Sequence, residues 1–167
     1  AIIGFAELAK AEACTPAQRQ YLEIVSARSE DLLVLINDIL DLSRIESERL
    51  ELKPEPFNIS TMMDAVAQMF MPAAKNKGLE LRVELDNRLS HEVYGDVRRL
   101  RQILVNLVGN AIKYTQRGSV SLSVKPAVSD RPLPDKLAVH FVVADPGIGI
   151  PREQLEILFT PFTQLSN

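Results

Sequence analysis

The chain has 167 residues, of which 46% are hydrophobic and 25% charged, an ordinary balance for a globular protein with an apolar core. Its net charge of −3 includes no basic excess that would attract a phosphate backbone, so nucleic acid is not expected as a partner. The only cysteine, Cys14, excludes an internal disulfide and a thiolate metal cluster, and no apolar run approaches the ~20 residues that a membrane span requires.

The first fifty residues predict two helices and no strand. An apolar run at the start of the chain is typical of a helix that ends near Ala13. A second helix follows, because Thr15 can cap it, Pro16 suits its first position and Gln18 completes a capping box. From there to about Leu50 the chain has neither Gly nor Pro, which leaves room for ~8–9 helical turns.

The second helix carries an apolar stripe that is too wide for a single hairpin to bury. The stripe comprises Val25, Leu32, Leu33, Leu35, Ile36, Ile39, Leu40 and Leu42, several of which recur every seven residues. Two hairpins packed as a four-helix bundle would cover it, so the pattern favours a dimer. The alternative is a helix that docks on its own domain.

From Glu51 onward the chain mixes helices and strands. Pro54 and Pro56 bracket a short extended stretch, and Asn58 can cap a helix that stops at Gly78. The elements expected after it are a half-buried strand at 79–85, a helix at about 97–115, strands at about 119–124 and 137–144, and a short helix at about 152–159. This order predicts an α+β fold in which helices cover one sheet.

The helix at about 97–115 carries an unusual polar stripe. Asn106, Asn110 and Lys113 are spaced i, i+4, i+7, and the stripe is centred roughly 140° from the apolar face. That face comprises Leu100, Ile103, Leu104, Leu107, Val108, Ala111 and Ile112. Asn is a mediocre helix former and Gly109 costs about 1 kcal/mol relative to Ala, so their placement within one turn needs a reason. One interpretation is a polyphosphate site, in which Asn oxygens bind Mg²⁺ and Lys113 contacts phosphate. The other is a solvated face with a glycine that lets a neighbouring element approach.

A second polar motif follows a buried strand. The run Phe141–Ala144 leads into Asp145-Pro146-Gly147-Ile148-Gly149. A carboxylate at a strand end can accept a hydrogen bond from an exocyclic amine such as that of adenine, and glycines let the backbone approach a flat ligand. On its own the pattern is weak, because Asp-Pro-Gly is also a common turn.

Taken in order, these motifs resemble the histidine kinase family within the wider group of gyrase-, MutL- and kinase-type ATP folds. Residues 106–115 are similar to the N box, residues 145–151 to the first glycine box and residues 158–164 to the F box. Residues 38–46, Asp-Ile-Leu-Asp-Leu-Ser-Arg-Ile-Glu, resemble the dimerisation hairpin of the family.

The resemblance implies an antiparallel helical hairpin at 1–50, half of a dimeric four-helix bundle, followed by an α/β sandwich ATP-binding domain at 51–167. It also implies a sensor histidine kinase core that binds Mg-ATP and transfers the γ-phosphoryl group to a histidine about two helical turns before Ala1. The phosphoryl group would then pass to an aspartate in the receiver domain of a response regulator. The family's lid and second glycine box would follow Asn167, so the chain by itself is not expected to autophosphorylate.

The resemblance further implies a homodimer formed through the hairpin and a cytoplasmic location, with any membrane contact made by regions outside this sequence. It assigns roles to nine residues. Asn110 would hold Mg²⁺, with Asn106, a candidate catalytic residue, beside it. Lys113 would contact phosphate, Tyr114 would pack against the base, and Asp145 would accept a hydrogen bond from the adenine amino group. The pocket would be lined by Gly147 and Gly149, and the lid would be supported by Phe159 and Phe162. Tyr114 and the two phenylalanines could equally be core aromatics.

Two positions bear on the choice of activity. Gyrase-type relatives carry a water-activating glutamate where this chain has Asn106. Transfer of a phosphoryl group to a protein nucleophile therefore fits better than ATP hydrolysis by a gyrase-type ATPase. Pro146 stands where the family usually has a small polar residue, and it restricts Asp145 to extended conformations. It motivates an alternative: a kinase-like regulatory module that acts by hetero-dimerisation and has a weakened nucleotide site.

Overall fold

The computed structural model describes residues 2–12, 15–127, 138–158 and 160. The chain forms two compact units, Ala1–Glu51 and Leu52–Asn167. Among the helices of the described residues, none combines the length and the apolar character needed to cross a lipid bilayer.

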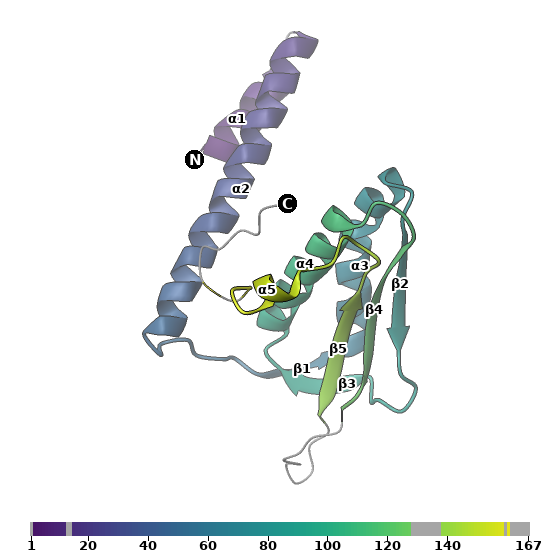
Figure 1. The fold of residues 1–167 in the computed structure, drawn as a ribbon. Coiled ribbons are helices and arrows are strands. Elements are labelled where there is room, and N and C mark those ends of the chain that lie inside the picture. The colour runs from purple at the N-terminus through teal and green to yellow at the C-terminus, as the bar shows by residue number, and fades with distance from the viewer. Residues whose placement is uncertain (1, 13–14, 128–137, 159, 161–167) are drawn as a thin grey trace. The chain divides into compact units, whose positions relative to one another are not determined.

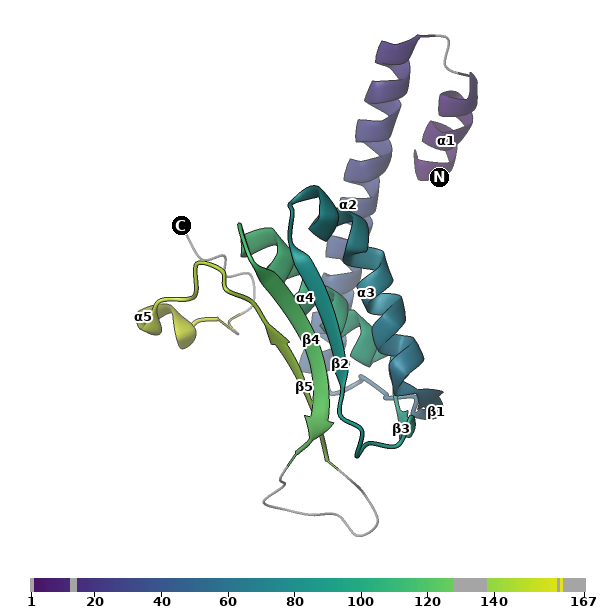
Figure 2. The same cartoon turned by 90° about the vertical axis from the view of Figure 1, so that its right-hand side faces the viewer.

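The first unit is an antiparallel helical hairpin, in which α1 (Ile2–Glu12) lies beside the N-terminal half of α2 (Pro16–Glu46) (Figures 1 and 2). The capping box at the start of α2 is confirmed: the Gln18 N–H donates to Thr15 Oγ1 at 3.2 Å, and the Thr15 N–H donates to Gln18 Oε1 at 3.0 Å. Ala6 is buried between the helices, and Lys10 forms an ion pair with Glu23 at 3.0 Å.

The second helix ends four residues earlier than predicted, at Glu46 rather than near Leu50. Glu48 adopts a left-handed backbone with φ of 55°, and the Arg49 N–H donates to the Arg44 carbonyl at 2.8 Å. A left-handed residue with a bond reaching back five residues is a common way to close a helix. The sequence lacks the glycine that usually marks such an end, which is why the predicted helix is too long.

The apolar stripe of α2 is largely exposed within the first unit. The exposed side chains, each 43–59% accessible, are Ile24, Val25, Leu32, Leu33, Val34, Leu35, Ile36, Ile39 and Leu40. Packing against α1 therefore leaves most of the stripe uncovered among the described residues. A further apolar surface is needed to bury it.

In its described residues, the second unit is built from helices and from strands that form two sheets. Its elements are β1 (Glu55–Asn58), α3 (Ile59–Asn76), β2 (Glu80–Leu85), β3 (Glu92–Gly95), α4 (Val97–Tyr114), β4 (Ser119–Pro126), β5 (Val139–Ala144) and α5 (Arg152–Leu155). The main sheet has the order β2-β4-β5, with β2 parallel and β5 antiparallel to β4. The expectation of one sheet is wrong, because β1 and β3 form a separate antiparallel pair in which Phe57 lies opposite Val93.

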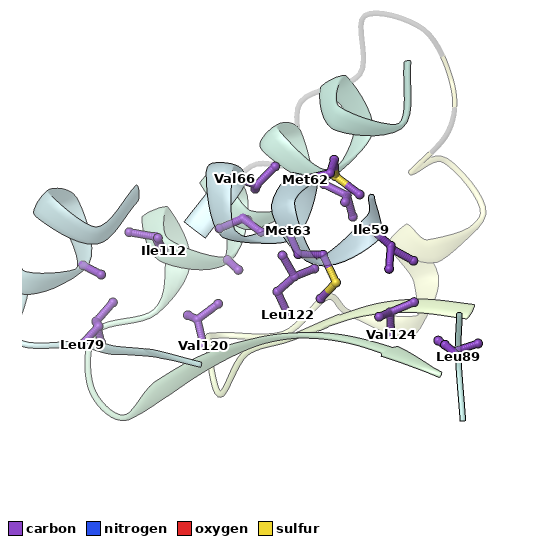
Figure 3. Close-up of a cluster of buried hydrophobic side chains, with 14 residues drawn as sticks. Ile59, Met62, Met63, Val66, Leu79, Leu89, Ile112, Val120, Leu122 and Val124 are labelled. Carbon is purple, nitrogen blue, oxygen red and sulfur yellow. The ribbon is translucent and has the colours of Figure 1, made fainter. Parts of the chain in front are cut away.

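Helices α3 and α4 cover one face of the main sheet (Figure 2). The central strand β4 alternates fully buried Val120, Leu122 and Val124 with half-buried serines on the opposite face. The buried side chains meet those of α3 and α4, including Ile59, Met63 and Val66 (Figure 3). Each large apolar side chain that becomes fully buried stabilises the fold by about 1.5–3 kcal/mol. This core fixes α4 against the sheet.

The predicted apolar face of α4 is only partly buried. Leu104, Val108, Ala111 and Ile112 are buried, but Ile103 and Leu107 are 56% and 47% exposed. A helix in the single layer over a sheet can be covered by the sheet below and by one neighbouring helix. Both exposed residues lie on a part of α4 that neither α3 nor the sheet covers.

Candidate functional site

The start of α4 is fixed by Asp96. Its Oδ1 accepts the Arg99 N–H at 3.0 Å, the usual N-cap bond, and its Oδ2 accepts the Lys53 N–H at 2.9 Å. The backbone hydrogen bonds from Lys53 and then Arg99 lower the pKa of the Asp96 carboxyl. Asp96 therefore both caps α4 and ties it to the segment that precedes β1.

The predicted polar stripe lies on the solvent-exposed surface of α4. Asn106, Asn110 and Lys113 are all exposed. Asn106 and Asn110 are one turn apart on the same edge, a spacing that lets both side chains reach one ligand. Two amide oxygens fit Mg²⁺, which takes few protein ligands and keeps waters and phosphate oxygens in its shell. The Lys113 ammonium lies 5.1 Å from the centroid of the Tyr114 ring, a cation–π contact.

Helix α3 approaches α4 at the glycine beside this stripe. A Cβ at Gly109 would lie 3.4 Å from Cζ of Phe70, so α3 comes close to α4 at this position. Another element does approach at Gly109, as the alternative interpretation expected, but at an ordinary contact distance that alanine would also tolerate. This approach does not account for the two asparagines, which lie on the exposed edge.

The C-terminal end of α4 meets the end of β5. Thr115, the C-cap of α4, is completely buried, and its Oγ1 donates to Asp145 Oδ1 at 3.5 Å. The Gly147 N–H donates to the same oxygen at 2.8 Å. Asp145 is exposed, so its carboxylate retains acceptor positions for a ligand. At 1.5 Å per residue, Thr115 is only about 7–8 Å beyond Asn110 along the helix axis.

The loop after Asp145 packs closely against the end of α4. A Cβ at Gly147 would clash with Asp145 Oδ1 and lie 3.1 Å from the Tyr114 carbonyl oxygen, so the position requires glycine. Pro146 faces the loop after α4, where a Cβ at Gly118 would lie 3.2 Å from its Cγ. The structure thus brings Tyr114, Asp145 and Gly147 together at one end of α4.

The other predicted site residues are placed as follows. Tyr114 is 40% exposed, so it is not a core aromatic. Gly149 has a left-handed φ of 70° and is exposed. Phe159 and Phe162 lie outside the described residues, as does most of the segment similar to the F box. The last helix, predicted to reach residue 159, ends at Leu155.

Sequence reasoning missed one residue beside the site. The Lys77 ammonium donates to the carbonyl oxygens of Ile112 and Lys113, at 2.8 Å each. Its partners are 35 and 36 residues further along the chain. A lysine near the end of one helix is common, and nothing local to it indicates that it caps a different helix.

Two family models match the chain. Residues 95–167 match the model described as "Histidine kinase-, DNA gyrase B-, and HSP90-like ATPase". Residues 1–48 match "His Kinase A (phospho-acceptor) domain". The site of α4 and β5 falls within the first match and the hairpin within the second.

Curated relatives and solved structures agree with these matches. "Signal transduction histidine-protein kinase BarA" of Escherichia coli is 37% identical over 98% of this chain, which covers 17% of that protein. A structure of full-length ShkA in complex with AMPPNP superposes with a TM-score of 0.73 at 33% identity, covering 92% of this chain and 31% of ShkA. Histidine kinase ThkA in complex with response regulator protein TrrA gives a TM-score of 0.59 at 25% identity, covering 98% of this chain and 46% of ThkA. The chain therefore spans less than a fifth of the length of BarA.

Proposed function

The chain belongs to the histidine kinase family, and on that basis we propose that it binds Mg-ATP and serves the transfer of the γ-phosphoryl group to a histidine of the intact protein. We assign residues 1–50 to the dimerisation hairpin and residues 51–167 to the ATP-binding domain. The division of the chain between Glu51 and Leu52 supports this assignment.

The observation that carries the proposal is the meeting of α4 with Asp145. The exposed edge with Asn106, Asn110 and Lys113 leads directly to Thr115, which contacts the Asp145 carboxylate. A nucleotide with its base at Asp145 could therefore extend its phosphates along α4. The AMPPNP complex of the similar kinase ShkA supports a nucleotide as the ligand.

Each residue would have a distinct role. Asp145 would accept a hydrogen bond from the adenine amino group, beside the close backbone of Gly147. Asn110, with Asn106 one turn before it, would hold Mg²⁺ through amide oxygens. The ion would neutralise charge on the phosphates. Lys113 would leave the Tyr114 ring to contact phosphate, while that ring packs against the base.

Transfer, rather than hydrolysis, suits these residues. A nitrogen of the acceptor histidine would form a bond to the γ-phosphorus, the bond from that phosphorus to the bridging oxygen would break, and ADP would leave. In such chemistry the protein mainly positions the groups and neutralises charge. Asn106 cannot act as a general base for water, because a side-chain amide does not accept a proton at neutral pH.

We propose that the hairpin forms a homodimer by packing into a four-helix bundle. The uncovered apolar stripe of α2 and the match of residues 1–48 to a phospho-acceptor domain support it. The receiver domain of a response regulator is the proposed partner, in line with the complex of ThkA with TrrA. Because ATP and such regulators occur in the cytoplasm, we propose that location too, with any membrane anchor elsewhere in the protein.

Calorimetric titration of the 167-residue chain with AMPPNP, in Mg²⁺ and in EDTA, tests the nucleotide site. We expect binding that Mg²⁺ strengthens and that Asp145→Asn weakens. Asp64→Asn is the matched control, because Asp64 is also exposed but lies on α3. Equal affinities of the two variants would contradict the role of Asp145.

Phosphoryl transfer is tested with a chain extended at its N-terminus to include the acceptor histidine. The extended protein should become labelled from γ-labelled ATP, and Asp145→Asn should abolish the labelling. Failure of the extended wild type to bind ATP would refute the proposal.

A further inference from the structure

The C-terminal end of α4 has carbonyl groups that the helix itself cannot pair. The last four carbonyls of any helix lack partners within it. Here the Ala111 carbonyl is satisfied by the Thr115 N–H at 3.0 Å. The next two carbonyls, of Ile112 and Lys113, need donors from elsewhere in the molecule.

Lys77 supplies both donors from another helix. It is the C-cap residue of α3, and its ammonium lies 2.8 Å from the carbonyl oxygen of Ile112 and 2.8 Å from that of Lys113. An ammonium has three donors and no acceptor, so it can bond two carbonyls at once. A positive charge at a helix C-terminus is also favoured by the helix dipole. Lys77 therefore links the ends of α3 and α4.

The turn that Lys77 holds is the turn that meets the candidate nucleotide site. Lys113 lies in it, and the next two residues contact the loop after β5. The Tyr114 carbonyl is adjacent to Gly147, and Thr115 reaches Asp145. Fraying of this turn would move all of these groups together.

We propose that Lys77 is a positioning residue for nucleotide binding, which sets the last turn of α4 against Asp145. This inference rests on the proposed function, because the ligand that benefits is the nucleotide. Lys77 acts through the backbone of α4 and touches no ligand itself. The removal of its ammonium should therefore loosen one turn and weaken binding without unfolding the domain.

The test compares Lys77→Met with Lys75→Met in the 167-residue chain. Lys75 is exposed and lies in the last turn of the same helix, so its replacement by methionine removes the same charge without removing the cap. Hydrogen exchange of the amides of residues 113–115 reports the turn in the absence of any ligand. AMPPNP titration with Mg²⁺ reports the site. Lys77→Arg, which keeps donors and charge, serves as the rescue variant, and Lys77→Gln is the milder change if Lys77→Met fails to fold.

We expect faster exchange at residues 113–115 and about three- to tenfold weaker AMPPNP binding for Lys77→Met, with Lys75→Met like the wild type and Lys77→Arg close to it. Unchanged exchange at this turn, or equal AMPPNP affinities of the two methionine variants, would overturn the inference. A wild type that binds no AMPPNP would refute the proposed function and the positioning role together. Altered exchange beside unchanged affinity would refute the positioning role alone.

Discussion

Replacement of Asn110 by alanine should weaken Mg²⁺-dependent nucleotide binding while it stabilises the domain that carries the site. Asn110 is exposed in the middle of α4, so alanine removes little packing. Alanine is favoured over asparagine in a helix interior by about 0.6 kcal/mol. For a domain of this size, that corresponds to a rise of about 2 °C in Tm.

The same substitution, Asn110→Ala, should weaken nucleotide binding although it stabilises the fold. A side-chain oxygen that contacts a charged group contributes about 1.5–3 kcal/mol, so its loss should weaken Mg-AMPPNP binding about tenfold or more. Binding in EDTA should change much less, because Asn110 is assigned to the ion. Calorimetry with and without Mg²⁺, together with thermal unfolding of the same samples, measures both effects.

A matched control separates helix propensity from ligand binding. Asn37 is also exposed in the interior of a helix, α2, and Asn37→Ala should leave AMPPNP affinity unchanged. If Asn110→Ala raises Tm but binds Mg-AMPPNP as tightly as the wild type, Asn110 has no part in the site. If it lowers Tm by several degrees, the Asn110 side chain contributes to the stability of the fold.

Three further predictions concern stability. Leu122 is fully buried in β4, and Leu122→Ala should cost about 3–5 kcal/mol, measured by urea unfolding; a cost below about 1 kcal/mol would contradict the packing described. Gly109→Ala should stabilise the domain by up to about 1 kcal/mol, because the new Cβ makes an ordinary contact with Phe70. Gly118→Ala should destabilise the domain, because φ is 102° and Pro146 occupies the space that the new Cβ would take. Thermal unfolding that shows Gly118→Ala as the more stable variant would refute this comparison. The side-chain hydrogen bonds from Arg88 lower the pKa of Asp86 to about 2, so the stability they contribute is present above the ordinary pKa of about 4 and lost as pH falls through about 2. Urea unfolding of the wild type and Asp86→Asn should therefore converge between pH 4 and pH 2, and a constant difference would contradict the assignment.

Features set by neighbouring residues were predictable from the sequence. The caps at Thr15 and Asn58 form as expected, because a capping side chain bonds a backbone amide three residues away. The end of α2 was not predictable, since Glu48 closes the helix with a left-handed backbone that its residue type does not announce. The pairing of β1 with β3 was missed for another reason: it joins Glu55 to Gly95, and short extended runs carry no signal of a distant partner.

The candidate site was predictable in its parts and their order, but not in how they meet. The exposed stripe at Asn106 and Asn110 follows from helical periodicity. The contact of Thr115 with Asp145 depends on where α4 ends relative to β5, which only the packed core determines. Periodicity placed Ile103 on the apolar face but did not reveal its exposure, because periodicity identifies an apolar side and not how much of it a neighbour covers.

The central claim is that one nucleotide occupies both the exposed edge of α4 and the Asp145 loop. Titration of the ¹⁵N-labelled chain with Mg-AMPPNP, followed by NMR, tests it directly. The side-chain amide of Asn110 and the backbone amides of Thr115 and Gly147 should shift together and saturate with one common Kd. Shifts at Gly147 without any at Asn110, or two different dissociation constants, would show that these residues do not belong to one site.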